Sequence, residues 1–147
     1  MAVRKAAGRN PSASARHRAR AVALQALYAW KLGGSDVLDG WDDCDQDFAK
    51  QLVSEVILKN EQLEKRISPH LNRSLASLSP VERVILLMGT YELAERLETP
   101  FKVVLNEAIE LGKSYGGTDG HKFVNGVLEK LALELRAEEI ARVRQAV

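Results

Sequence analysis

The amino-acid sequence predicts an all-α protein, folded as a compact helical bundle. Apolar residues recur with the 3.6-residue period of an amphipathic helix in one stretch after another. Helix start signals precede two of these stretches (Ser79-Pro80 and Thr99-Pro100), and glycine pairs that stop helices follow the first stretch (33–34) and the one that starts after Thr99-Pro100 (116–117). Because no segment shows the alternating pattern of a strand or the turn residues of a hairpin, helices are the only predicted elements.

The amino-terminal region divides into a basic arm and a first helix. Residues 1–14 offer no periodic apolar face and are expected to be disordered, which leaves 15–147 as a single helical domain. A helix from about Ala15 to Leu32 has a core stripe and, beside it, a second strip about 80° wide. The core stripe contains Ala23, Ala26, Leu27 and Trp30, and the second strip contains His17, Arg20, Leu24, Tyr28 and Lys31.

Two more helical stretches are predicted in the middle of the chain. Residues 35–47 contain six aspartates and are expected to form a loop. The helix after it carries the apolar residues Phe48, Leu52, Val53, Val56 and Ile57, and Asp45 or Asp47 can cap its amino terminus. A further helical stretch spans Leu63, Ile67 and Leu71 and is broken near Pro69.

The carboxy-terminal half carries specific helix signals. Residues 79–82, with the sequence SPVE, form a capping box with proline at the first helical position. The run 84–88 is apolar on all sides and predicts a buried helix, although its periodicity also fits a short buried strand. A helix over 101–115 follows, and the last long helix begins near Asp119 with its apolar stripe at Phe123, Val124, Val127, Leu128, Leu131 and Leu135.

The net charge of +1 conceals an uneven distribution. The first 35 residues contain seven Lys and Arg and no acidic residue, whereas the remaining 112 contain 14 Lys and Arg against 20 Asp and Glu. A basic end on an acidic body indicates polyanion binding, with a solubilising tail as the alternative. Since no apolar run reaches the roughly 18–20 residues of a membrane span and no signal peptide is evident, we expect a cytoplasmic protein without membrane contact.

The sequence offers little for catalysis, and we expect neither an enzyme nor a metal or cofactor site. The three histidines (His17, His70 and His121) lie on separate elements, and none has a metal-ligand spacing with the single cysteine, Cys44. The glycine-rich residues 116–122 do not match a phosphate-binding loop, because His121 occupies the position of the lysine and no strand precedes them.

The first predicted helix has side chains suited to single-stranded RNA. Arg16, Arg18 and Arg20 can neutralise phosphates, while His17 and Tyr28 can stack on exposed bases. The alternative is that Tyr28 lies at the edge of the core and that the arginines are a solvated helix start. Because cations at a helix amino terminus are disfavoured by the macrodipole, RNA contact is the favoured interpretation.

Three stretches of the chain resemble the NusB family. Residues 15–30 (ARHRARAVALQALYAW) are similar to the opening of NusB proteins. Residues 100–113 (PFKVVLNEAIELGK) and 121–128 (HKFVNGVL) match the two most specific stretches of the family. The resemblance covers residues 15–136, which leaves only the two ends of the chain outside it.

This resemblance implies an all-α fold of two small helical subdomains and a role in transcription antitermination. It implies binding to the boxA element of ribosomal RNA leader transcripts as a heterodimer with NusE, a small-subunit ribosomal protein. The pair would load onto RNA polymerase with other Nus factors and suppress premature termination. The RNA-binding positions of the family fall at Arg16, His17, Arg18, Arg20, Tyr28, Asp119, Lys122 and Phe123, and the NusE contact falls at Glu82.

Several alternatives stay open at this point. The same helical module is the amino-terminal domain of certain RNA cytosine methyltransferases, but this chain is expected to end after the module. The other alternative is that the chain is a stand-alone adaptor that binds RNA or protein. Among single residues, His17 stands where the family often has arginine, Asp119 can instead cap its helix, and Phe123 can pack in the core.

Overall fold

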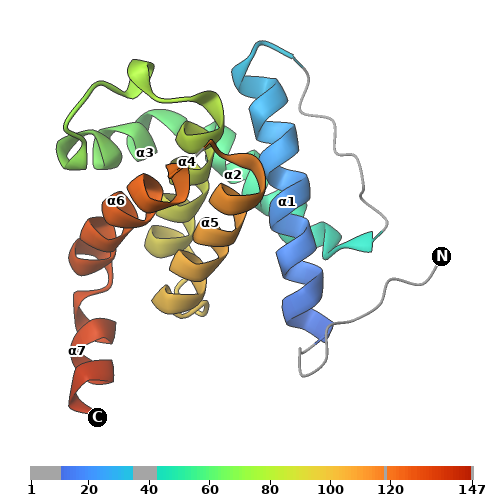
Figure 1. Ribbon diagram of the computed structural model, residues 1–147. Coiled ribbons are helices and arrows are strands. Elements are labelled where there is room, and N and C mark those ends of the chain that lie inside the picture. The colour runs from blue at the N-terminus through green and yellow to red at the C-terminus, as the bar shows by residue number, and fades with distance from the viewer. Residues whose placement is uncertain (1–10, 35–42, 118, 147) are drawn as a thin grey trace. The chain divides into compact units, whose positions relative to one another are not determined.

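Helices make up the regular secondary structure of the described residues, 11–34, 43–117 and 119–146 of this computed structural model (Figure 1). This part of the chain contains seven α-helices: α1 (Pro11–Lys31), α2 (Gln46–Leu58), α3 (Asn60–Ile67), α4 (Pro80–Glu95), α5 (Phe101–Tyr115), α6 (Gly120–Leu135) and α7 (Ala137–Gln145). Two short 3-10 helices, η2 (Ser68–His70) and η3 (Leu75–Ser77), lie between α3 and α4. The chain divides into two compact units after Leu58, which confirms the predicted all-α fold of two small subdomains.

The first unit consists of α1 and α2, which pack against each other. The buried apolar residues of the two helices are Ala19, Val22, Ala23, Leu24, Ala26, Leu27, Phe48, Ala49, Leu52, Val53 and Val56. Asp45 caps α2 as predicted, because its Oδ1 accepts a hydrogen bond of 3.1 Å from the Phe48 N–H.

Helix α1 differs from its prediction in two respects. It begins at Pro11, so residues 11–14 belong to the helix and not to the predicted disordered arm; the rest of that arm, 1–10, lies outside the described residues. Proline suits a first helical position because the N–H it lacks would have no partner there. In addition, Trp30 is only half-buried while Leu24 is 2% exposed, so the core face extends into the strip expected to face RNA.

Helix α4 forms the centre of the second unit. It packs against α3, α5 and α6, and α5 and α6 also pack against each other. Every residue from Val84 to Leu93 is buried, which confirms the helix predicted from the apolar run. The capping box is also confirmed, because the Glu82 N–H donates to Ser79 Oγ at 3.2 Å. Helices α4 and α6 approach closely at Gly89, where a Cβ would lie 2.8 Å from the Leu128 side chain.

Helix α7 and the residue before it, Arg136, were not predicted from the apolar pattern. Arg136 is 4% exposed, and its guanidinium donates at 2.7–3.0 Å to four carbonyl oxygens at the end of α4 and in the turn before α5, those of Glu92, Leu93, Arg96 and Thr99. It also pairs with Glu139, whose other carboxylate oxygen accepts from the Phe101 N–H at 2.8 Å. Glu139 of α7 therefore caps α5, a role that the sequence suggested for Thr99.

Candidate nucleic-acid interface

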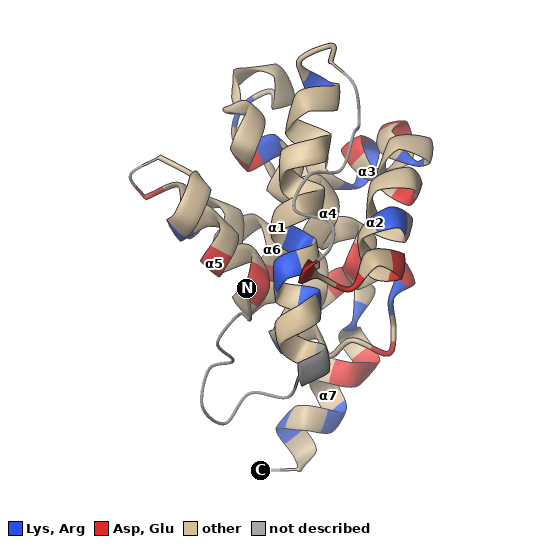
Figure 2. Cartoon of the chain, turned by 90° about the vertical axis from the view of Figure 1, so that its right-hand side faces the viewer, with Lys and Arg blue, Asp and Glu red and all other residues tan. Residues whose placement is uncertain are grey.

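An acidic segment before α2 lies against the basic residues of α1 within the first unit. Arg16 Nε is 3.6 Å from Asp45 Oδ2, and Arg18 Nε is 3.8 Å from Asp43 Oδ2 and also donates to the Asp43 carbonyl. The Asp45 N–H donates to the Ala15 carbonyl at 3.1 Å, which holds the segment against the helix. Figure 2 marks the Lys and Arg of α1 in blue and the acidic residues in red.

These ion pairs leave both arginines accessible. The side chains of Arg16 and Arg18 are 37% and 31% exposed. Exposed pairs of this kind contribute only about 0.2–1 kcal/mol, because water screens the charges. A phosphate can therefore replace either carboxylate at little cost in free energy.

The ring of Phe48 contacts two of the three arginines that are predicted to bind RNA. The guanidinium carbons of Arg16 and Arg20 lie 4.9 and 4.8 Å from the ring centroid, within the range of a cation–π interaction. Arg20, however, is only 3% exposed. Arg16 and Arg18 are thus the arginines of α1 that solvent reaches, and Arg20 lies beneath them.

The second strip of α1 does not form a continuous exposed face. Leu24 and Arg20 are buried, His17 is half-buried, and Tyr28 is 37% exposed. Tyr28 lies about 12 Å farther along the helix axis than Arg20, given 1.5 Å per residue. The exposure of Tyr28 supports the surface interpretation over the core interpretation, and it separates the ring from the arginine cluster.

Asp119 and Lys122 lie at the start of α6 in the second unit. Asp119 is left-handed, with φ of 63°, and its side chain makes no capping hydrogen bond to α6. Instead, its Oδ1 is 3.2 Å from Lys122 Nζ. The capping alternative for Asp119 is therefore wrong. Close approach of α5 fixes this end of α6, because a Cβ on Gly112 would lie 2.8 Å from His121 Cβ.

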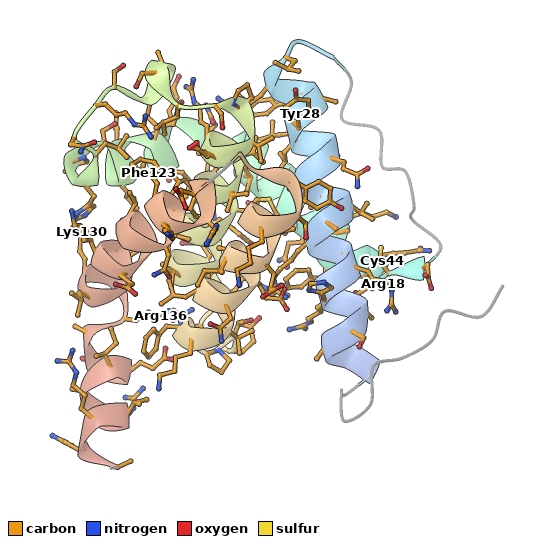
Figure 3. All side chains as sticks on the ribbon, viewed as in Figure 1. Arg18, Tyr28, Cys44, Phe123, Lys130 and Arg136 are labelled. Carbon is orange, nitrogen blue, oxygen red and sulfur yellow. The ribbon has the colours of Figure 1, made fainter. Side chains whose placement is uncertain are left out.

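A groove of about 360 Å³ lies between α6 and the residues around η2. Its walls include His70, Leu71 and Asn72 on one side and Lys122, Phe123, Gly126 and Lys130 on the other. Phe123 is half-buried, so the ring is neither a core residue nor fully exposed. Both lysines are exposed, and Figure 3 labels Phe123 and Lys130 on α6. The groove thus combines an aromatic wall with two accessible cations.

Arg73 is the residue of this surface that sequence reasoning missed. Its guanidinium carbon lies 4.4 Å from the centroid of the Phe123 ring, and its Nη2 is 3.9 Å from Glu82 Oε1. Arg73 lies between the two short 3-10 helices, and no motif or periodicity in the sequence singles it out. Glu82, predicted as a partner contact, is thereby connected to the ring predicted to stack on RNA.

The fold and these two surfaces define a small all-helical protein with accessible cationic and aromatic side chains in each unit. Across the described ranges, no three His, Cys, Asp or Glu side chains gather in an arrangement that could hold a metal ion. None of the helices in this part of the chain combines the length and apolar character that crossing a membrane requires.

Comparisons with known sequences give the family. Residues 17–133 match the NusB family. The transcription antitermination protein NusB of Dechloromonas aromatica is 45% identical over 145 residues, which cover 92% of this chain and 89% of the relative. The chain belongs to the NusB family. The predicted role as a transcription antitermination factor is thereby confirmed. The prediction that the chain is not an enzyme agrees with this family membership.

Solved structures agree with this result. T. maritima NusB superposes with a TM-score of 0.76 at 29% identity, covering 86% of this chain and 96% of that one. A crystal structure of antitermination factors NusB and NusE in complex with dsRNA superposes with a TM-score of 0.68 at 30% identity, covering 80% of this chain and 96% of that one.

Proposed function

We propose that this protein binds the boxA element of ribosomal RNA leader transcripts together with NusE. The pair joins RNA polymerase with other Nus factors and helps it to read through terminators in the bacterial cytoplasm. The observation that carries the proposal is the lysine-lined groove beside Phe123, in a chain whose relatives are antitermination proteins. The solved complex of NusB and NusE with dsRNA supports both partners.

Phosphate contact comes from the accessible cations of both units. Arg16 and Arg18 exchange their carboxylate partners for RNA phosphates, which releases counterions from the RNA and makes the affinity depend on salt. Lys122, 71% exposed, contributes in the same way at the start of α6. These contacts supply affinity without reading sequence.

Base recognition comes from the aromatic and polar side chains. Tyr28 and Phe123 stack on unpaired bases, and the half-buried imidazole of His17 adds a third flat surface. Asp119 orients Lys122 and accepts a hydrogen bond from a base amino group, since an ionised carboxylate only accepts hydrogen bonds. Arg20 contributes indirectly, because it contacts the ring of Phe48, which Arg16 also contacts.

A binding titration tests this proposal. The purified full chain is titrated with a boxA oligonucleotide and with a scrambled control, each with and without NusE. We expect tighter binding to boxA than to the control, and a further increase when NusE is present. Equal affinity for both RNAs would overturn the proposal, and capture of NusE without any RNA binding would favour a protein-binding adaptor.

Glu82 is proposed as the NusE contact, and its role in the capping box needs a matched control. Glu82→Lys should weaken capture of NusE in the absence of RNA, because it reverses the charge that the partner meets. Ser79→Ala removes the cap while keeping the carboxylate, at a cost of about 0.5–2 kcal/mol in stability. If Glu82→Lys captures NusE as well as Ser79→Ala does, this contact is wrong.

A further inference from the structure

The guanidinium of Arg73 lies over the ring of Phe123. Its carbon is 4.4 Å from the ring centroid, within the range of a cation–π interaction. The side chain nevertheless remains 45% exposed. One face of the ring is therefore already covered, and the group that covers it is a planar cation open to solvent.

Glu82 holds Arg73 in this place. One carboxylate oxygen of Glu82 is 3.9 Å from Arg73 Nη2, and the other accepts from the Ser79 hydroxyl at 3.2 Å. The Glu82 N–H is bound in turn to Ser79 Oγ, so the first turn of α4 fixes the carboxylate. With its side chain only 14% exposed, Glu82 is a rigid anchor for a more accessible arginine.

A guanidinium held in this way is a stacking surface for a nucleic-acid base. Unpaired bases stack on guanidinium planes as well as on aromatic rings, and a guanidinium that lies on an aromatic ring extends the stack by one layer. Lysine also bears a positive charge, but it has no plane on which a base can lie. Lys122 and Lys130, exposed along the neighbouring groove, are placed for the phosphates on either side.

We propose that Arg73 is a base-stacking residue of the RNA interface, with Phe123 beneath it and Glu82 as its positioning residue. This inference rests on the proposed function, because it names a further contact of the same RNA surface. It changes the role of Phe123: the ring supports the guanidinium, and the base lies on Arg73. It also gives Glu82 an effect on RNA affinity that does not require a protein partner.

Substitutions of Arg73 separate stacking from charge. Affinity for the boxA oligonucleotide is measured without NusE, at several salt concentrations, for Arg73→Ala and Arg73→Lys. We expect both to lose affinity, by roughly 5- to 150-fold for the loss of one base stack, and Arg73→Lys to keep the wild-type salt dependence. Arg142→Ala and Arg142→Lys, on the exposed side of α7, are the matched controls and should bind as wild type does.

A double-mutant cycle tests the positioning role of Glu82. Glu82→Gln should weaken RNA binding in the wild-type background and have no further effect in the Arg73→Ala background, whereas a general folding defect would persist in both. Wild-type affinity in Arg73→Lys, or an undiminished effect of Glu82→Gln in the double variant, would overturn the inference. Wild-type protein that fails to prefer boxA over the scrambled control would instead overturn the proposed function.

Discussion

The candidate RNA-binding cations of the two units differ in how exposed their side chains are. In the first unit, Arg16 and Arg18 face Asp45 and Asp43, and Arg20 is buried against Phe48. In the second unit, Lys122 is 71% exposed and its neighbour Lys130 is exposed as well. Among the candidate RNA-binding cations of the described residues, the arginines of the first unit are therefore less exposed than the lysines of the second.

This difference shows that the number of charged residues in a stretch of sequence does not tell how accessible their side chains are in the folded protein. A cluster without acidic neighbours in sequence acquires acidic neighbours in space when a loop folds back onto it. Substitutions of Arg136, Phe123, Arg20 and Asp43 distinguish side chains that stabilise the fold from side chains that are accessible to RNA.

Arg136→Ala should have the largest effect, since Arg136 is the most fully committed cation of the second unit. Its loss removes one donor from each of four carbonyl oxygens and leaves Glu139 without its cation, and we expect the free energy of unfolding to fall by about 3–5 kcal/mol. Urea unfolding measures this. Arg142→Ala, an exposed arginine of the same helix region, should change stability by less than about 0.5 kcal/mol. Similar values for the two variants would contradict the role assigned to Arg136.

Phe123→Ala should affect RNA affinity more than stability. The ring is half-buried, so its removal should cost less than the 3–5 kcal/mol typical of emptying a buried aromatic site. We expect a loss of about 1–3 kcal/mol in binding to boxA RNA, measured by titration beside a denaturant melt. Tyr28→Ala is the counterpart in the first unit, where 37% exposure predicts an even smaller stability cost. A large loss of stability without loss of RNA binding would show that Phe123 is a core residue and not an RNA contact.

Arg20→Ala should reduce stability by about 2 kcal/mol, because a desolvated cation–π contact and the buried stem of the side chain are both lost. Arg18→Ala, at the exposed margin of the same cluster, should change stability little and should instead reduce the slope of log affinity against log salt by roughly 0.7. Thermal melts and salt titrations on both variants check this. If Arg20→Ala is as stable as Arg18→Ala, the distinction between them fails.

Asp43→Asn should have the smallest effect, and its sign is the informative part. The change removes a carboxylate that competes with phosphate for Arg18, so RNA affinity should rise by about 0.2–1 kcal/mol, the usual value of an exposed ion pair. Asp47→Asn, an exposed aspartate in the first turn of α2, controls for the change in net charge. Equal gains in the two variants would mean that long-range charge, and not competition at Arg18, sets the affinity.

Local signals in the sequence predicted most of the helices. The capping box at Ser79, the buried run of α4 and the glycine stop after α5 each depend on residues close together in the chain, and each was confirmed. Helix α7 was missed, although its ends carry the charges that suit a helix, with Glu138 and Glu139 in its first turn and Arg142 and Arg144 in its last.

Two side-chain contacts that the sequence did not reveal join residues distant in the chain. Arg73 reaches a ring 50 positions away, and Arg136 bonds to carbonyls 37–44 positions away. The periodicity of a helix says which face is apolar, but not which loop will cover an arginine or which carboxylate will cap a neighbour. Tyr28 and Lys122 are exposed, as RNA contact requires, whereas Arg20 is buried, which the sequence did not indicate. Their RNA contacts stay predictions.

The bonds of Arg136 also bear on where this protein can be shortened. The match to the NusB family ends at residue 133, three positions before Arg136 and six before Glu139. A fragment cut at that boundary would end within α6 and lack α7, so the turn between α4 and α5 would lose the guanidinium of Arg136 and α5 would lose the carboxylate of Glu139. The region that the family model matches is thus shorter than the region joined by these contacts, which extends into α7.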